Sequence, residues 1–142
     1  MAQYSGIFTT TQQMQAQGAS NWPSPAYSAE ILVVAGGGGA AGTWESGPGG
    51  GGGYLEGTLS LAIGTSYTVT VGAGGSAGPN NQDNTANGYQ GGNSVFDTAT
   101  ALGGGGGQWY QSSDTSRKNG GSGGGVARGL TAGTATQGNS GG

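Results

Sequence analysis

The chain has no cysteine and no histidine among its 142 residues. Their absence excludes disulfide bonds, Cys–His and Ser–His nucleophile pairs, and most zinc sites. Only 6% of the residues are charged, with three Lys and Arg against six Asp and Glu. So few basic residues argue against a nucleic-acid partner, which needs clustered Lys or Arg. No apolar stretch approaches the length of a membrane span, so we expect no membrane insertion.

The acidic residues give no sign of catalysis. They are scattered along the chain, and no pair has a spacing that suggests general acid–base chemistry. The six are Glu30, Glu45, Glu56, Asp83, Asp97 and Asp114. Residues 47–52 match the pattern G-x-G-x-x-G, but the dinucleotide fingerprint needs a following helix, which further glycine does not supply. Residues 80–84 offer oxygen ligands of the kind calcium takes, although a solvated polar turn is the favoured interpretation. We therefore expect a non-enzyme without cofactor or metal.

Glycine is what the chain has in abundance, with 37 residues against 17 Ile, Leu, Val and Phe together. Glycine has no side chain to bury, so the fold must rest largely on backbone hydrogen bonds. Without disulfides, apolar area buried between copies of the chain is a further source of stability. The glycines expected to form the packing surface are Gly36, Gly37, Gly38, Gly39, Gly49, Gly50, Gly51, Gly52, Gly53, Gly72, Gly74, Gly75, Gly103, Gly104, Gly105, Gly106, Gly107, Gly123, Gly124 and Gly125.

The other residues predict a mostly β fold. Residues 30–35 are a continuous apolar run, which is typical of a strand buried on both faces. Residues 54–63 and 67–71 alternate between apolar and polar, and the turn at Gly64 is expected to join them as a hairpin. Shorter strands are expected at 94–96 and 100–102. Residues 9–18 suit one short helix that begins at a threonine and ends at a glycine, although an extended segment is the alternative.

The sequence is compatible with two structures for the glycine runs. Five consecutive glycines suit extended threefold helices of the polyproline II type, here polyglycine II, which have no internal hydrogen bonds and pack side by side where no Cβ intervenes. Flexible linkers are the alternative. In the first case a small antiparallel β region leads into packed glycine helices. The expected organisation is a polar N-terminal lead-in over 1–29, which could donate a strand to another subunit, and a glycine-rich domain over 30–142.

The order of five sequence blocks resembles a known family. The blocks are residues 31–39, 49–54, 65–75, 91–96 and 100–107. They closely resemble the glycine-rich domain of bacteriophage tail-fibre and adhesin proteins. Gly6-Ile-Phe-Thr, the Gln- and Ala-rich segment and Trp22-Pro23 are also similar to the openings of short structural proteins of tailed phages. The resemblance implies a β hairpin region leading into stacked glycine helices, in a component of a virion fibre or its tip.

Two functions follow from the resemblance as expectations. The first is a structural, self-associating protein that forms an extracellular or virion-associated filament, and the short lead-in favours it. No signal peptide is visible at the N-terminus. The second is a receptor-binding adhesin, which would contact a host-cell receptor through loops between the glycine runs. Aromatic residues beside glycine runs are expected mainly to pack on the glycine surface. The candidate contact residues are Trp44, Tyr89, Trp109, Tyr110, Arg117 and Lys118.

Overall fold

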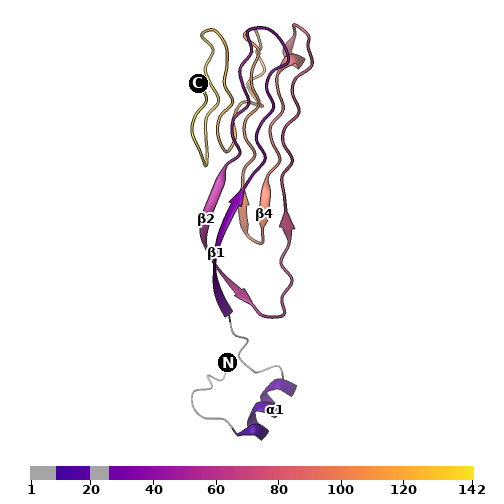
Figure 1. Cartoon of the computed structure of the whole chain (residues 1–142), viewed down its shortest axis with the longest axis vertical. Coiled ribbons are helices and arrows are strands. Elements are labelled where there is room, and N and C mark those ends of the chain that lie inside the picture. Colours follow the sequence, from indigo (N-terminus) through magenta and orange to yellow (C-terminus); the bar gives the residue numbers. More distant parts are fainter. Residues whose placement is uncertain (1–8, 20–25) are drawn as a thin grey trace.

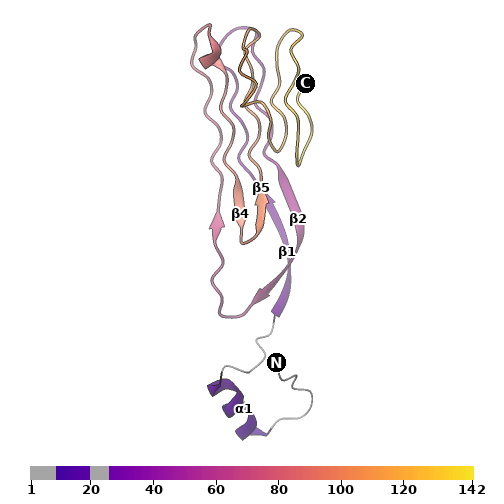
Figure 2. The same cartoon turned by 180° about the vertical axis from the view of Figure 1, so that it is seen from behind.

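The structure is a computed structural model that describes residues 9–19 and 26–142. Within 26–142, β strands lie at one end and long glycine-rich segments run beside one another to the other end (Figures 1 and 2). The predicted mostly β fold with one short helix is confirmed. No helix in the described ranges is long and apolar enough to cross a membrane.

The short helix α1 (Thr10–Gly18) forms in the lead-in. Thr9 Oγ1 accepts the amide of Gln12 at 3.3 Å, and Gln12 Oε1 accepts the amide of Thr9 at 3.0 Å. This reciprocal pair is a capping box, which satisfies amides at the start of a helix that have no partner within it. The helical alternative is therefore the correct one for residues 10–18. Residues 1–8 of the predicted donor segment lie outside the described residues.

Two strands form the first sheet. β1 (Ala26–Val34) pairs antiparallel with β2 (Tyr54–Ala62) in the register Ala26↔Ala62 to Val34↔Tyr54. The prediction that residues 30–35 are buried on both faces is wrong, because the burial of β1 alternates: Val33 is 8% exposed, whereas Leu32 is 66% exposed. The two-strand sheet has one side packed on the rest of the molecule, and successive side chains of a strand point to opposite sides.

Three short strands form the second sheet, in the order β3-β4-β5: β3 (Val69–Thr70), β4 (Ser94–Phe96) and β5 (Ala99–Ala101). The predicted hairpin between 54–63 and 67–71 is wrong, since β2 pairs with β1 and β3 pairs with β4. The turn itself exists, with Gly64 at a φ of 77°, a backbone conformation that glycine adopts without strain. There the chain crosses from one sheet to the other.

The small hydrophobic core lies between the two sheets. Val33, Ala99 and Ala101 are its buried members, and Ile31, Ala35, Leu55, Leu59 and Phe96 pack against them. β1 contacts β4 and β5, and β2 contacts β5. One further element, the 3-10 turn η1 (Asn84–Ala86), lies between two glycine-rich segments, and the Asp83 carboxylate caps it by accepting the amide of Thr85 at 2.7 Å.

Candidate functional site

Six glycine-rich segments extend beyond the strands, and we call them the glycine runs. They are the first run (35–42), the second (47–53), the third (72–78), the fourth (86–92), the fifth (102–108) and the sixth (120–126). Most residues in them have neither helical nor strand hydrogen bonding of their own. Their backbone groups bond instead to other runs.

The hydrogen bonds between runs recur every three residues. Ala35, Gly38 and Ala41 donate to the carbonyls of Gly53, Gly50 and Gly47 in the second run, at 2.9, 2.8 and 3.2 Å. Gly36, Gly39 and Gly42 donate to Gly92, Tyr89 and Ala86 in the fourth run, at 3.1, 2.9 and 2.9 Å. The backbone amides of the first run thus donate to the second and the fourth run within each group of three residues. A three-residue repeat differs from the two-residue period of a strand and from the 3.6 residues of an α-helix turn.

We call this network of backbone hydrogen bonds between the runs the lattice. The fifth run lies at its centre. Gly103 through Gly107 are buried, and the run bonds to four others. Gly104 and Gly107 donate to Gly36 and Gly39, and Gly105 and Gln108 donate to Ser122 and Gly125, all at 2.9–3.0 Å. The carbonyls of Leu102, Gly105 and Gln108 accept from Gly53, Gly50 and Gly47, and those of Gly104 and Gly107 accept from Gly91 and Gly88. Backbone pairing fills the role that side chains have in an ordinary core.

Most predicted packing glycines have no room for a side chain. A Cβ on Gly105 would meet the carbonyl of Lys118, and one on Gly38 would meet the carbonyl of Gly105, both far inside van der Waals contact. Gly37, Gly51 and Gly74 are the exceptions, because their nearest neighbours would lie 3.6–3.8 Å away. For these three residues the prediction of close packing is wrong. Gly51 and Gly74 are exposed and Gly37 is half-buried, and a Cβ on any of the three would meet its neighbours at an ordinary contact distance.

Several single and paired glycines were missed as packing residues. A Cβ would collide with backbone at Gly42, Gly47, Gly78, Gly88, Gly91, Gly120, Gly121, Gly133 and Gly141. A signal for some of them exists in the sequence, since glycine recurs every three residues at 36, 39 and 42, at 47, 50 and 53, and at 72, 75 and 78. In the third run those three glycines are half-buried, whereas the Ala73, Ser76 and Ala77 between them are exposed. In the first three runs, therefore, the three-residue spacing identifies packed glycines that run length does not.

The candidate contact residues do not form one surface. Trp109 is only 5% exposed, packs edge-on against Tyr110 with ring centroids 5.4 Å apart, and is therefore not available to a receptor. Lys118 donates to the carbonyl of Thr131 at 2.6 Å, while its own carbonyl accepts the amide of Gly124. Both belong to the packing of the glycine runs. Among the aromatic candidates, Trp44 is the most exposed at 84%, and Tyr89 follows at 44%.

A second pair of candidates, Tyr89 and Arg117, is also in contact. The Arg117 guanidinium lies 4.3 Å from the centre of the Tyr89 ring, a cation–π geometry. Arg117 Nε is also 3.8 Å from an Asp114 carboxylate oxygen. The Arg117 carbonyl accepts the amide of Gly106 at 2.8 Å. This bond holds the three side chains against the outside of the fifth run.

The turns that join the runs at the end remote from β1 and β2 form what we call the loop end (Figure 1). It comprises residues 43–46, 79–85, 109–116 and 127–132. Trp44 lies in the first of these turns. Next to it Glu45 and Arg128 form an ion pair between two turns, and both residues have a positive φ. Neither was among the sequence-predicted contact residues, because charge pairing between distant turns leaves no local pattern.

A buried polar cluster anchors the turn at 109–116. Asn87, Gln108 and Ser112 are each at most 5% exposed. Asn87 Nδ2 donates to Ser112 Oγ at 2.6 Å, Asn87 Oδ1 accepts the amide of Trp109 at 3.0 Å, and Gln108 Nε2 donates to the Asp114 carbonyl. Buried polar groups cost free energy unless they are paired, so these bonds fix the turn on the fourth and fifth runs.

The carboxylates near the loop end are structural. Hydrogen bonds from the Ser116 side chain and amide hold the pKa of Asp114 below its ordinary 3.8, and Thr85 lowers the pKa of Asp83 in the same way. Bonds to the charged form of a carboxyl group favour that form. Among the described residues no cluster of three or more acidic side chains could hold a metal ion.

Comparison with known proteins gives a family. A model of the glycine-rich domain family matches residues 12–142, so the chain belongs to that family. No curated protein matches the chain. No solved structure matches it either.

Proposed function

We propose that this glycine-rich domain protein is a structural, self-associating subunit of a phage-like fibre or filament, outside the cell or in a virion, and not an enzyme. The observation that carries the proposal is the backbone lattice of the glycine runs. It extends over residues 35–142 and is made mainly of backbone groups bonded to one another. The resemblance of the five sequence blocks to the glycine-rich domain of phage tail-fibre and adhesin proteins supports the phage-like part.

We further propose that the runs are polyglycine II helices. The support is the three-residue repeat of the bonds between runs, because this helix has three residues per turn and no internal hydrogen bonds. It directs successive amides to different neighbours, as residues 35 and 36 do toward the second and fourth runs. A stack of such helices suits a stiff spacer, a role that needs shape and not chemistry.

Electron microscopy and sedimentation velocity of the purified chain, over a wide range of concentrations, test self-association. We expect filaments or long oligomers whose fraction rises with concentration. A chain that remains a monomer at every concentration would overturn the proposal. The lattice test described below is independent of this result, since a monomer can have the same lattice.

The second candidate, a receptor-binding adhesin, is favoured by Trp44. Trp44 is 84% exposed, and the residue after it, Glu45, forms an ion pair with Arg128. Trp and Arg are enriched among energetically dominant contact residues. This role predicts that purified protein blocks phage adsorption to host cells and that Trp44→Ala abolishes the block. Tyr27→Ala, at a ring 57% exposed on β1, is the control and should still block.

A further inference from the structure

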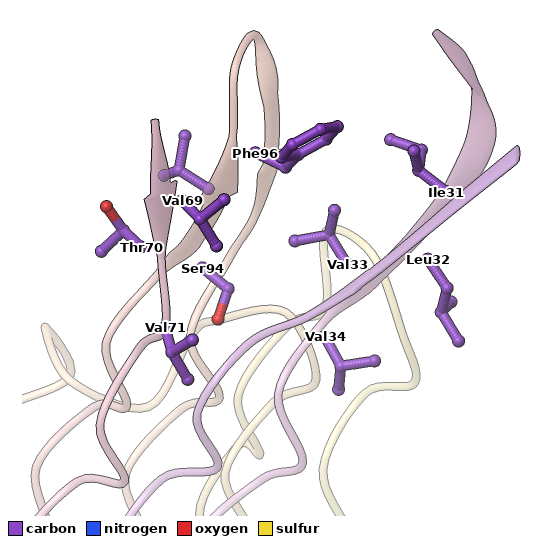
Figure 3. A pocket seen from close by; sticks show the side chains of 10 residues that line it. Ile31, Leu32, Val33, Val34, Val69, Thr70, Val71, Ser94 and Phe96 are labelled. Atoms are coloured by element: carbon purple, nitrogen blue, oxygen red, sulfur yellow. The ribbon is translucent and has the colours of Figure 1, made fainter. Parts of the chain in front are cut away.

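An uncharged groove lies between β1 and β3. It has a volume of about 380 Å³. Its lining residues are Ile31, Leu32, Val33, Val34, Val69, Thr70, Val71, Ser94, Val95 and Phe96. Figure 3 shows Ile31 and Val33 on one side of β1, with Leu32 and Val34 on the other, and β3 across the open space. The groove thus exposes apolar side chains and the backbone edge of β1 to solvent.

The groove exists because one sheet covers the other incompletely. The two strands β1 and β2 lie against β4 and β5, whereas β3, among the strands that the structure describes, contacts β4 alone. Val69 and Val71 consequently remain 66% and 84% exposed. One more strand beside β1 would give both sheets three strands and would cover these valines.

The edge of β1 can take such a strand. Within the described residues β2 is the only sheet partner of β1, and β4 is the only partner of β3. No backbone hydrogen bond from Leu32 or Val34 to a residue outside the β1–β2 pair occurs there. An unpaired edge is a template for a strand from another chain.

We propose that residues 2–8 of a second copy add to the free edge of β1 and cover Val69 and Val71. This inference rests on the proposed self-association and names its interface. The segment reads Ala-Gln-Tyr-Ser-Gly-Ile-Phe and lies outside the described residues. As a strand it places Ala2, Tyr4, Gly6 and Phe8 on one face and Gln3, Ser5 and Ile7 on the other. The face with both aromatic rings would lie on the apolar groove, and the face with the two polar side chains, and with Ile7 beside them, would lie toward water.

The length of the segment and the geometry of the contact also fit. Seven extended residues span about 23 Å, at about 3.3 Å each, which exceeds the four-residue edge from Ile31 to Val34. Neither the side chains of residues 2–8 nor those that line the groove carry a charge, so the contact buries no charged side chain of either. A segment of one copy in the groove of the next is a head-to-tail contact, and such contacts generate open filaments.

Two variants with complementary defects test the interface. Deletion of residues 2–8 removes the donor, and Val69→Lys with Val71→Lys blocks the acceptor at exposed positions where the fold tolerates change. We expect each variant alone to be a monomer in sedimentation velocity and their mixture to form a one-to-one dimer. Ile63→Lys, at an apolar residue 58% exposed outside the groove, is the matched control and should assemble like the original chain.

A peptide of residues 2–9 gives a second readout. Labelled with a fluorophore, it should bind the deletion variant. Adding the two lysines to that variant should weaken binding by at least about tenfold, since a buried charge without a partner is costly. A scrambled peptide should not bind, and Ile63→Lys should leave the affinity within about twofold, as expected of a surface change away from the contact.

The outcomes separate this interface from self-association itself. Filaments that persist in both the deletion and the lysine variants would overturn the interface and leave self-association standing. If the deletion variant binds the peptide but the mixture stays monomeric, the segment occupies the groove of its own chain, and the second-copy proposal is wrong. An original chain that is always monomeric contradicts the proposed function as well.

Discussion

Whether a glycine of this protein can be replaced by alanine depends on the atoms that the added Cβ would meet. Gly105 and Gly51 belong to similar runs, yet a methyl group on Gly105 would strike the Lys118 carbonyl, whereas the nearest atom to one on Gly51 is Ser122 Oγ at 3.8 Å. The two residues therefore make a matched pair in which the same substitution meets opposite surroundings.

Gly105→Ala should lower the free energy of unfolding by about 3 kcal/mol, as overpacking against fixed backbone does. Gly51→Ala should leave it unchanged or raise it by about 0.4–1 kcal/mol, because alanine reduces the entropy of the unfolded chain. Urea unfolding measures both. Equal destabilisation by the two alanines would contradict a lattice in which only inward glycines touch backbone.

Asp114 should make the turn at 109–116 sensitive to acid. Its pKa is lowered in the folded state by the Ser116 side chain and amide, so the stability it contributes is complete above its ordinary pKa of 3.8. That contribution is lost as the pH falls through the lower folded value. Amide exchange of the turn, compared above and below pH 3.8, should show the loosening, and Asp114→Asn should remove the difference. An unchanged acid response in that variant would show that other groups cause it.

At the scale of elements, one side chain ties the end of the chain to the second sheet. Gln137 Oε1 accepts the amide of Leu102 at 2.6 Å, and Gln137 Nε2 donates to the carbonyl of Thr100 at 2.9 Å. The side-chain amide of Gln137 thus pairs with the backbone of β5 and of the start of the fifth run as a neighbouring strand would. The rest of residues 133–142 bonds through its backbone to residues 120–126.

Gln137→Ala should destabilise residues 133–142 locally by about 1–3 kcal/mol, because it leaves two part-buried backbone groups without partners. Faster amide exchange confined to that segment is the expected result. Gln111→Ala, at an exposed glutamine in the turn at 109–116, is the control and should not alter it.

The sequence was informative where side chains define an element. Thr9 and Gln12 mark the start of α1, and alternation identifies β2. The partner of β2 was not predictable, because Gly64 permits a hairpin turn and a crossover equally well. For the runs, glycine content identified the packing residues but not their orientation. Whether Gly51 or Gly105 faces backbone depends on which runs adjoin it, and that contact is not local in the sequence.

The contact residues show the same division. Trp109 and Trp44 both follow glycine-rich sequence, and no local pattern distinguishes them. Burial of Trp109 depends on its place at the end of the central fifth run, where its amide bonds to Asn87, whereas Trp44 lies in the turn at 43–46 and is 84% exposed. The ion pair of Glu45 and Arg128 likewise depends on two turns that adjoin in the fold, although the two residues are 83 positions apart in the sequence.

For the whole molecule, the lattice predicts a gradient of protection. The amides of Gly104 and Gly107 are buried at the centre and should exchange only through global unfolding, while Gly141, in the last and partly exposed segment, should exchange through local opening. Hydrogen exchange resolved by NMR measures the order. Similar exchange rates for Gly141 and for Gly104 and Gly107 would contradict the gradient, because the last segment would then not open independently of the central run.

The direction of the hydrogen bonds between runs has a mechanical consequence. The runs lie along the long axis of the 26–142 body (Figure 1), and their bonds cross from run to run. A pull along that axis therefore loads many bonds in shear at the same time, whereas a sideways pull would break them one after another. The three-residue repeat sets the number of bonds that share the load, so tensile strength grows with the length of the runs and needs no larger core.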